Sequence, residues 1–300
     1  MNIKHPNLKF YFHTHEKYFP STFEYVASNS ELVVDNQNLG VKSQVELAQY
    51  NCDGKDVYIN MSHSIKHGMK DLDFPLYYFA RNVGEFLYIT YFMVYPYNGD
   101  YNLILAKTGG HWGDIERLTL EYDKNGNLTR VYFGAHGDKD GRWIEYKDLE
   151  IEDNSIVVYI AKNGHGFYPK KGMYFRLYGL ANDVTNRGKV YTPYQLVEIP
   201  KDPTTYDLTS LGLSYFCGKL GKDGIVSLVK KAWYYDQPEI SIKPPPMINQ
   251  NTYFATLGLI TLILLFTLFK LYKTSSNKII YFTLIILIML TIRGIILNIE

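Results

Sequence analysis

A short segment near the middle of the chain, Gly110–Glu116, contains one imidazole and two carboxylates within six residues. These are His111, Asp114 and Glu116. Mixed nitrogen and oxygen ligands suit zinc or manganese, and they suit calcium or magnesium where waters and carbonyl groups complete the shell. A bound metal ion could bridge to an anionic ligand or activate water. The segment therefore indicates a candidate ligand site.

The two carboxylates are expected at the beginning of a β-strand. In a strand over Asp114–Tyr122 the side chains alternate between faces, so Asp114 and Glu116 share the face that carries two leucines. An unpaired carboxylate is costly to bury on an apolar face. We therefore expect a positive partner beside the two acids. His111, three residues before Asp114, could supply a neutral nitrogen there.

The same cluster has a simpler explanation. Asp114 could cap a turn after Gly109-Gly110, and Glu116 could pair with a lysine at a solvated end of the strand. Spacing alone favours neither explanation, because short motifs often match by chance.

The turn Lys124–Asn127 predicts the register of the next strand. Its Asn-Gly pair tolerates the positive φ of tight hairpins. If the ends of this turn pair, Glu116 lies opposite Ala135, whose small side chain leaves room for an ion or ligand group. By the same count His136 lies on the far face, unless the segment Gly134–Gly137 carries a bulge, so its place in the site stays open.

A further histidine, His165, follows the predicted strand Ser155–Ala161 and the pair Asn163-Gly164. It could enter the same end of the sheet, although a lone histidine in a glycine-rich loop is more often simply exposed. The candidate ligands of a divalent cation (Ca, Mg, Mn or Zn) are therefore His111, Asp114, Glu116 and His165.

Strand patterns separated by turns extend from about Lys9 to Tyr235. The aromatic and β-branched run Phe86–Tyr95 is typical of a central strand buried on both faces. Helical periodicity is scarce, although Asp223–Tyr234 could form one helix. The pattern predicts an all-β fold, a β-sandwich or jelly-roll-like domain over residues 1–240.

The end of the chain is predicted to enter a membrane. Residues 253–269 carry no charge, and residues 279–297 form a second apolar run. Each is long enough to cross a bilayer core at about 1.5 Å per helical residue. With the polar loop 270–278 between them, they predict a transmembrane helical hairpin over 253–298 and a multi-pass protein. The Pro-rich segment 241–252 is predicted to be a stiff linker.

Two rules disagree about the side of the membrane on which the large domain lies. The loop residues Lys270, Lys273 and Lys278 would lie in the cytosol by the positive-inside rule, which places the domain outside. The first residues, Met1–Leu8, contain no apolar signal region, which favours the cytosolic side. We expect the cytosolic side, because loop lysines only bias the orientation.

Charge and cysteine content exclude some classes of protein. The chain has 31 Lys and Arg against 30 Asp and Glu, so no polybasic groove for a nucleic-acid partner is predicted. Cys52 and Cys217 have no paired spacing, which excludes a disulfide framework or a zinc knuckle. We expect buried thiols, and a single bridge between the two stays open.

Five ordered motifs resemble the vacuolar protein sorting-associated protein 62 family. They lie at residues 8–22, 91–98, 113–116, 163–169 and 216–221. The resemblance spans about residues 8–240. It implies a β-rich domain with a link to vacuolar sorting, and it predicts a fold more than a function.

The segment Gly110–Glu116 is also similar to the heptapeptide Gly-His-Arg-His-Asp-Trp-Glu of the necrosis- and ethylene-inducing-peptide-like cytolysins. In that family the His, Asp and Glu help to hold a divalent cation used against sphingolipid head groups. The similarity implies the same role for the histidine and two carboxylates named above. Trp112, Gly113 and Ile115 replace the Arg, second His and Trp of that family.

Three functions fit these features. The first is a membrane-tethered module that binds a divalent cation and, through it, an anionic or polyol ligand such as a lipid or glycan head group, with a role in membrane trafficking. The second is a metal-dependent hydrolase of phosphoester or glycosidic bonds, with Glu116 or His165 as general base. The third is a non-catalytic scaffold without ligand. Because the chain lacks a nucleophile motif such as Gly-x-Ser-x-Gly, we expect a binding module rather than an enzyme.

Overall fold

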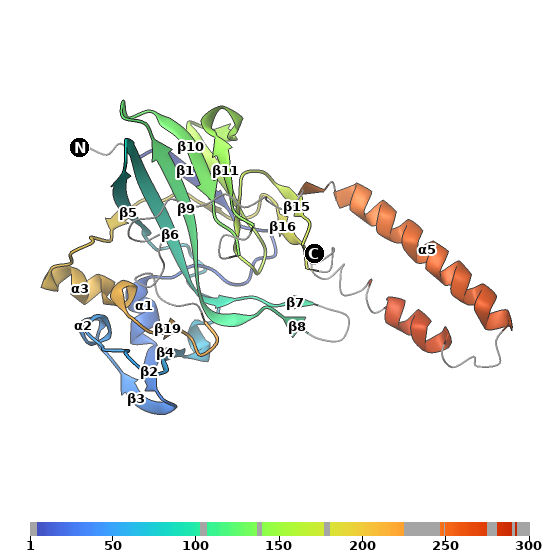
Figure 1. Cartoon of the computed structure of the whole chain (residues 1–300), viewed down its shortest axis with the longest axis horizontal. Helices are drawn as coiled ribbons and strands as arrows, with labels where there is room; N and C mark the ends of the chain where they lie inside the picture. Colours follow the sequence, from blue (N-terminus) through green and yellow to red (C-terminus); the bar gives the residue numbers. More distant parts are fainter. Residues whose placement is uncertain are drawn as a thin grey trace.

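The computed structural model describes residues 5–102, 107–136, 140–176, 181–224, 247–248, 250–274, 281–289 and 292. These residues form a mostly β domain built of several sheets, from which a long C-terminal helix projects (Figure 1).

The largest sheet has six strands in the order β11-β10-β9-β6-β5-β18. Their bounds are β5 Leu76–Val83, β6 Phe86–Asn98, β9 His111–Tyr122, β10 Leu128–Phe133, β11 Arg142–Glu145 and β18 Leu196–Glu198. β6 pairs with β9 from Leu87↔Tyr122 to Asn98↔His111. The predicted central strand is therefore confirmed, and it extends to Asn98.

The hairpin of β9 and β10 has the predicted register near the site. Leu120 pairs with Val131 and Leu118 with Phe133. The register shifts between Leu128 and Arg130, close to the turn. The apolar rows of the two strands therefore match, as expected from the Asn-Gly turn.

A second sheet covers one face of the first. It runs in the order β12-β13-β1-β17, with β14 paired to β13. The bounds are β1 Asn7–Tyr11, β12 Ile151–Glu152, β13 Ser155–Ile160, β14 Phe167–Tyr168 and β17 Val190–Tyr191. Phe10 of β1 and Val158 of β13 share one apolar core with Tyr91, Leu118 and Leu120 of the central sheet. This core lies on the face that was predicted to carry the site carboxylates.

The other face of the central sheet is covered by a four-stranded sheet and short helices. The strands are β2 Ser30–Val34, β3 Gln37–Val41, β4 Val57–Met61 and β19 Lys219–Leu220, and the helices are α1 Phe23–Ser28, α2 Gln44–Ala48, α3 Thr205–Leu211 and the 3-10 turns η1 His63–Ile65 and η4 Gly212–Tyr215. Phe92, Val94 and Ile115 pack here against Phe23 and Ile59. β6 is therefore buried on both faces. The short helices were not predicted, because five to seven residues show little periodicity.

The two remaining sheets are small. Strand β7 Tyr101–Asn102 pairs with β8 Lys107–Thr108, and β15 Gly172–Tyr174 lies between β16 Asp183–Thr185 and β20 Met247–Ile248. A 3-10 turn, η2 Tyr146–Asp148, follows β11. The arrangement as a whole is β-rich, as expected, but it has more sheets than a simple two-layer sandwich. The predicted helix Asp223–Tyr234 lies almost wholly outside the described residues.

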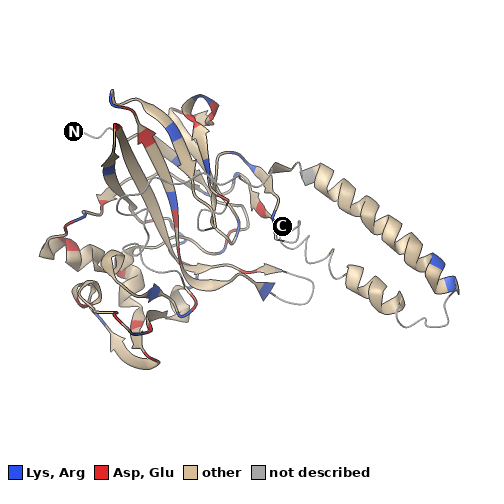
Figure 2. Cartoon of the chain, viewed as in Figure 1, with Lys and Arg blue, Asp and Glu red and all other residues tan. Residues whose placement is uncertain are grey.

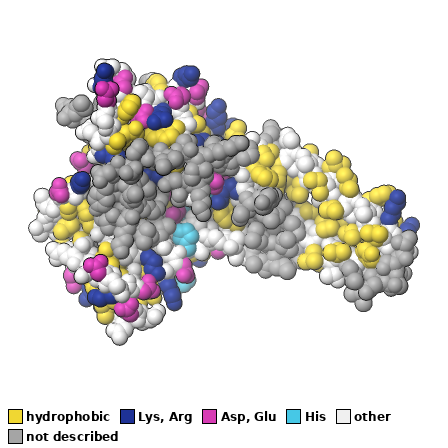
Figure 3. Space-filling model, viewed as in Figure 1, with side chains coloured by type: hydrophobic (Ala, Val, Ile, Leu, Met, Phe, Trp, Pro, Cys, Tyr) yellow, Lys and Arg dark blue, Asp and Glu magenta, His cyan; other side chains and the backbone are white. Residues whose placement is uncertain are grey.

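The helix α5 Gln250–Thr274 follows β20 directly. In the described part of the chain, its segment Asn251–Lys273 is the one stretch that is long and apolar enough to cross a membrane. Its described side chains are exposed or half-buried, and they are uncharged except for lysines near the C-terminal end (Figures 2 and 3). This indicates membrane association. The second predicted span, residues 279–297, lies partly outside the described residues. Its described segment 281–289 is helical.

The end of the predicted linker is joined to the domain. Met247 and Ile248 add an edge strand to β15. Tyr253, Phe254 and Leu257 of α5 then pack on the small apolar cluster that contains Met173 and Val184. The first turns of α5 are therefore held against the β domain.

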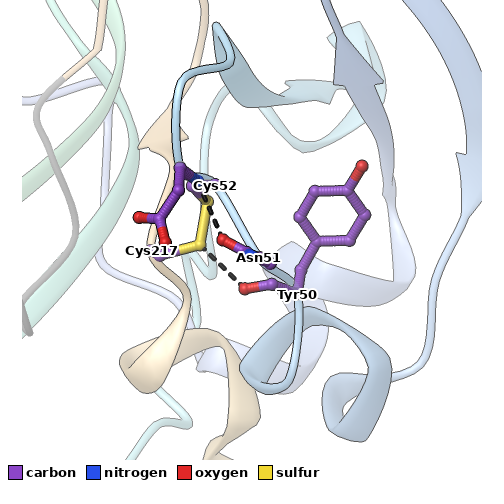
Figure 4. Close-up of a disulfide and its surroundings, with 5 residues drawn as sticks. Tyr50, Asn51, Cys52 and Cys217 are labelled. Atoms are coloured by element: carbon purple, nitrogen blue, oxygen red, sulfur yellow. Dashed lines mark hydrogen bonds between the residues drawn. A yellow bond between two sulfur atoms is a disulfide. The ribbon is translucent and has the colours of Figure 1, made fainter.

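The two cysteines are joined, which corrects the expectation of two buried thiols. Cys52 and Cys217 form a disulfide with Cα atoms 5.9 Å apart, across a sequence separation of 165 (Figure 4). The sulfur of Cys217 lies 3.0 Å from the carbonyl oxygen of Tyr50. Their spacing in the sequence could not show this, because the loop after α2 meets the segment after η4 only in the folded chain.

Candidate functional site

The two carboxylates of β9 lie where the alternation of side chains predicted them. Asp114 pairs with Tyr95 and Glu116 with Met93, on the face of the central sheet that carries the leucines. Their exposed fractions are 7% and 6%. Two acids thus reach into the core from the first residues of the strand, which requires compensation of their charge.

His165 reaches the same place from the turn between β13 and β14. Its Nδ1 lies 3.4 Å from Oδ2 of Asp114, and its ring stacks on Tyr95 with centroids 3.9 Å apart. The side chain is fully buried, and its backbone has a left-handed φ of 56°. The prediction that His165 enters this end of the sheet is confirmed, and the simpler explanation of an exposed histidine is wrong.

A third member, Glu16, was missed by the sequence analysis. Its Oε1 lies 3.8 Å from Nε2 of His165, and its side chain is fully buried. The carboxylate also accepts backbone N–H groups from Lys17 and Tyr18 at Oε1 and from Asn163 at Oε2, at 2.8, 2.9 and 2.8 Å. Glu16 lies in the first family-like motif, but nothing in the sequence connects it with β9.

The imidazole of His165 stabilises, and is stabilised by, the two carboxylates beside it. Burial alone lowers the pKa of His165, but Asp114 and Glu16 outweigh it and raise that pKa to about 9. Burial alone raises the pKa of Glu16, but His165 and the backbone N–H groups hold it below its usual value. We call Glu16, Asp114 and His165 the ion cluster. Its imidazolium is the positive partner that was expected beside Asp114.

His111 is not brought to the carboxylates. Its Nδ1 lies 3.0 Å from the carbonyl oxygen of Gly113, and the residue pairs with Asn98 across the ladder. Over the described ranges, no group of three or more His, Cys, Asp and Glu side chains has an arrangement that could hold a metal ion. A divalent cation held by His111, Asp114, Glu116 and His165 therefore stays a prediction.

Gly113 explains why the heptapeptide of the cytolysins is not reproduced. Its φ is +72°, and a Cβ at this position would lie 1.8 Å from the carbonyl oxygen of Leu220 in β19. No side chain fits between β9 and β19 without movement of the backbone. The histidine of the cytolysin motif is thus sterically excluded by the packing of this chain.

A second buried charge lies beside the ion cluster. Asp183 of β16 is fully buried and accepts hydrogen bonds from the hydroxyls of Tyr101 and Tyr168, each at 2.5 Å. Nε2 of His136 also lies 2.5 Å from this carboxylate, and a nitrogen of Arg176 lies at 3.5 Å. These partners outweigh burial and hold the pKa of Asp183 far below its usual value. His136 thus pairs with Asp183 rather than with the carboxylates on β9.

A partly exposed surface of aromatic and basic side chains lies beyond the ion cluster. In the pairing of β6 with β9, the pair Tyr97↔Trp112 lies two residues beyond the pair Tyr95↔Asp114. Side chains from the loop after β1 and from η1 and the residues after it join this pair. The surface, called the aromatic platform below, consists of Tyr18, His63, Lys66, His67, Tyr97 and Trp112.

The rings of the aromatic platform form a continuous row. Their centroids lie 5.6 Å apart for Tyr18 and His67, 5.0 Å for Tyr18 and Tyr97, 5.3 Å for Tyr97 and Trp112, and 5.2 Å for His63 and Trp112. The ammonium group of Lys66 lies 4.0 Å from the ring centre of Tyr97. Asp100, at the edge, accepts hydrogen bonds from the Tyr97 hydroxyl at 3.2 Å and the Gly110 backbone at 3.1 Å. No single motif in the sequence indicated this surface, because four chain segments contribute to it.

Fold and site together define a β-rich domain, joined to an apolar helix, that contains a buried ion cluster and an aromatic surface linked to it through Glu16 and Tyr18. The family model of vacuolar protein sorting-associated protein 62 matches residues 2–193. The chain belongs to this family. The resemblance seen in its ordered motifs is thereby confirmed.

Similar solved structures come from the necrosis- and ethylene-inducing proteins. NLPPya in complex with mannosamine has 11% sequence identity and a TM-score of 0.40, over 73% of this chain and 80% of that chain. NLPPya in complex with glucosamine has 12% identity and a TM-score of 0.42 over the same shares. Necrosis and Ethylene inducing Protein 2 from the causal agent of cocoa's Witches Broom disease has 14% identity and a TM-score of 0.34, over 65% of this chain and 76% of that one. No curated protein matches the chain.

Proposed function

We propose that this protein is a membrane-anchored module that binds a glycan or polyol head group at the aromatic platform. The observation that carries the proposal is the row of rings with Lys66 and Asp100 at its edge. Its central ring, Tyr97, is buried, and the other rings are half-buried or exposed. Aromatic faces pack against the C–H faces of sugar rings, while a few fixed polar groups orient the hydroxyls. A membrane helix would keep such a module near its ligand, so modest affinity would suffice for a role in membrane trafficking.

The ion cluster is connected to this surface by hydrogen bonds. Glu16 accepts the backbone N–H of Tyr18, which is part of the platform, and that of Asn163. Asn163 in turn accepts the N–H of Gly99 with its carbonyl oxygen and donates from its side chain to the carbonyl oxygen of Asp100. A fixed buried charge thus positions residues that would touch a ligand.

In this proposal the ligand binds the aromatic platform directly, without the predicted divalent cation. His165 already supplies one positive charge beside Asp114 and Glu16. In the hydrolase alternative, the raised pKa of His165, about 9, disfavours this histidine as general base at neutral pH and leaves Glu116 in that role.

The test uses the full chain in detergent micelles and glucosamine, mannosamine and a glycan array as probes. Tyr18→Ala and Lys66→Ala should weaken binding about tenfold or more, equivalent to roughly 1.4 kcal/mol, with the melting temperature retained. The matched control is Tyr206→Ala, since Tyr206 is a tyrosine on α3 that is 82% exposed and belongs to no such row. Binding should persist in a chelator. Binding that disappears with the chelator would support the cation-bridged alternative, and equal binding by the platform variants would refute the proposal.

A further inference from the structure

We infer that Asn127 and Asn60 are N-glycosylation sites and that the β domain lies on the lumenal or extracellular side of its membrane. The segments Asn127-Leu128-Thr129 and Asn60-Met61-Ser62 are the two Asn-x-Ser/Thr acceptors in the chain. Such segments are common by chance, so the inference depends on where the fold places them and on two independent signs of the side.

Asn127 lies at the tip of the β9–β10 hairpin. It is exposed, and its side-chain amide donates to Oδ2 of Asp123 at 3.1 Å, also on the surface. Glycan acceptors belong on surface loops, because the attached sugar is bulky and hydrated. This turn has space for one.

Asn60 lies on the solvent-facing side of β4. The strand has the burial pattern buried, buried, buried, exposed, buried, and Asn60 is its exposed residue. Ser62 of the same acceptor is exposed and caps η1. A glycan here would displace no core side chain.

The disulfide is the first independent sign of the side. Structural disulfides form and persist in oxidising compartments and are rare in the cytosol. Cys52 and Cys217 are the two cysteines of the chain, and both are used in the bridge. A domain with this bridge is expected to mature where N-glycosylation also occurs.

The distribution of lysines around α5 is the second sign. Lys270 and Lys273 lie in its last turns and Lys278 follows soon after, whereas the twenty residues before Tyr253 contain one basic residue, Lys243. The positive-inside rule places the lysine-rich end in the cytosol and the β domain on the opposite side. Both signs oppose the cytosolic placement expected from the first residues of the chain.

A glycan at Asn127 leaves the candidate site open. The hairpin tip follows the end of β9, whereas Asp114 and the aromatic platform lie at its beginning. At roughly 3.4 Å per residue, Asp114 and Tyr122 are about 27 Å apart. A glycan at Asn60 lies three residues before His63 of the platform, so binding should be compared before and after its removal.

The test is expression of the full chain in eukaryotic cells, followed by treatment with peptide-N-glycosidase F and gel electrophoresis. The wild type should lose two glycans, and Asn127→Gln and Asn60→Gln should each carry one fewer. Asn125→Gln, in the same turn but outside an acceptor, should migrate as wild type. The asparagines are changed rather than Thr129, whose hydroxyl donates to the Glu121 carbonyl at 3.0 Å and helps to hold the sheet.

Migration on a non-reducing gel reports the disulfide in the same sample. A wild type unaffected by the glycosidase would overturn the inference. A shift lost at only one asparagine would retain the proposed side of the membrane and refute the assignment of the other asparagine. Replacing both cysteines by serine should leave the glycans in place, because the acceptors do not depend on the bridge.

Discussion

The imidazole of His165 lies parallel to the phenol ring of Tyr95, at 6° between planes, while its Nδ1 faces Asp114 at 3.4 Å. The ring thus belongs to an aromatic stack and to an ion cluster at once. Three chain segments meet at this ring. We therefore expect its charge and its shape to contribute separately to the stability of the protein, and a substitution that keeps the shape can separate the two contributions.

Replacement of His165 by Phe should keep the stack on Tyr95 and remove the charge. Glu16 and Asp114 would then be buried without their cation, and breaking a buried pair in this way costs about 3–5 kcal/mol. Urea unfolding of the full chain in detergent measures the loss. The exposed His15→Phe is the control and should change stability by less than about 0.5 kcal/mol. Similar values for the two variants would show that the ion cluster contributes little.

Stability should fall as the pH rises through the folded pKa of His165. This pKa is about 9, against 6.5 for the ordinary side chain, so the native state binds the proton more tightly than the unfolded state. The contribution is fully present below pH 6.5 and is lost between there and pH 9, on the order of 3 kcal/mol in total. Unfolding free energies measured across this range should show the decline in the wild type. The decline should be absent from His165→Phe, and its persistence there would assign it to another group.

Replacement of Gly113 by Ala should destabilise the protein more than replacement of Gly126 by Ala. Both glycines have positive φ, which costs an L-residue about 1–2 kcal/mol. A Cβ at Gly126 meets nothing within 4 Å, whereas one at Gly113 would meet the Leu220 carbonyl oxygen at 1.8 Å. The difference in unfolding free energy between the two variants therefore measures the clash between β9 and β19. Equal losses would show that the backbones there separate easily.

Removal of the disulfide by Cys52→Ala together with Cys217→Ala should lower stability by about 2–5 kcal/mol. The bridge closes a loop across a sequence separation of 165, so its loss frees many conformations of the unfolded chain. Guanidinium unfolding with and without a reductant is the measurement. Reductant should destabilise the wild type and leave the double variant unchanged, and a wild type insensitive to reductant would argue against the bridge.

Local patterns predicted the elements that depend on neighbours in the sequence. The aromatic run of β6 is buried on both sides from Tyr88 onwards, and Asp114 and Glu116 lie on the leucine face. Leu118 pairs with Phe133 as predicted, although the register shifts between Leu128 and Arg130 near the turn. Alternation along a strand and the geometry of a tight turn depend on adjacent residues, so both can be predicted from the sequence alone.

Tertiary structure decided which distant groups meet. Glu16, Asp114 and His165 come from three segments, and only the pairing of β1 with β13 and of β6 with β9 brings those segments to one end of the core. The same holds for Cys52 with Cys217, and for Gly113, whose missing side chain makes space for Leu220. Burial in that core raises the free-energy cost of any unpaired charge, so the buried acids require a positive partner. In the folded chain this partner is His165, whereas the spacing in the sequence favoured His111.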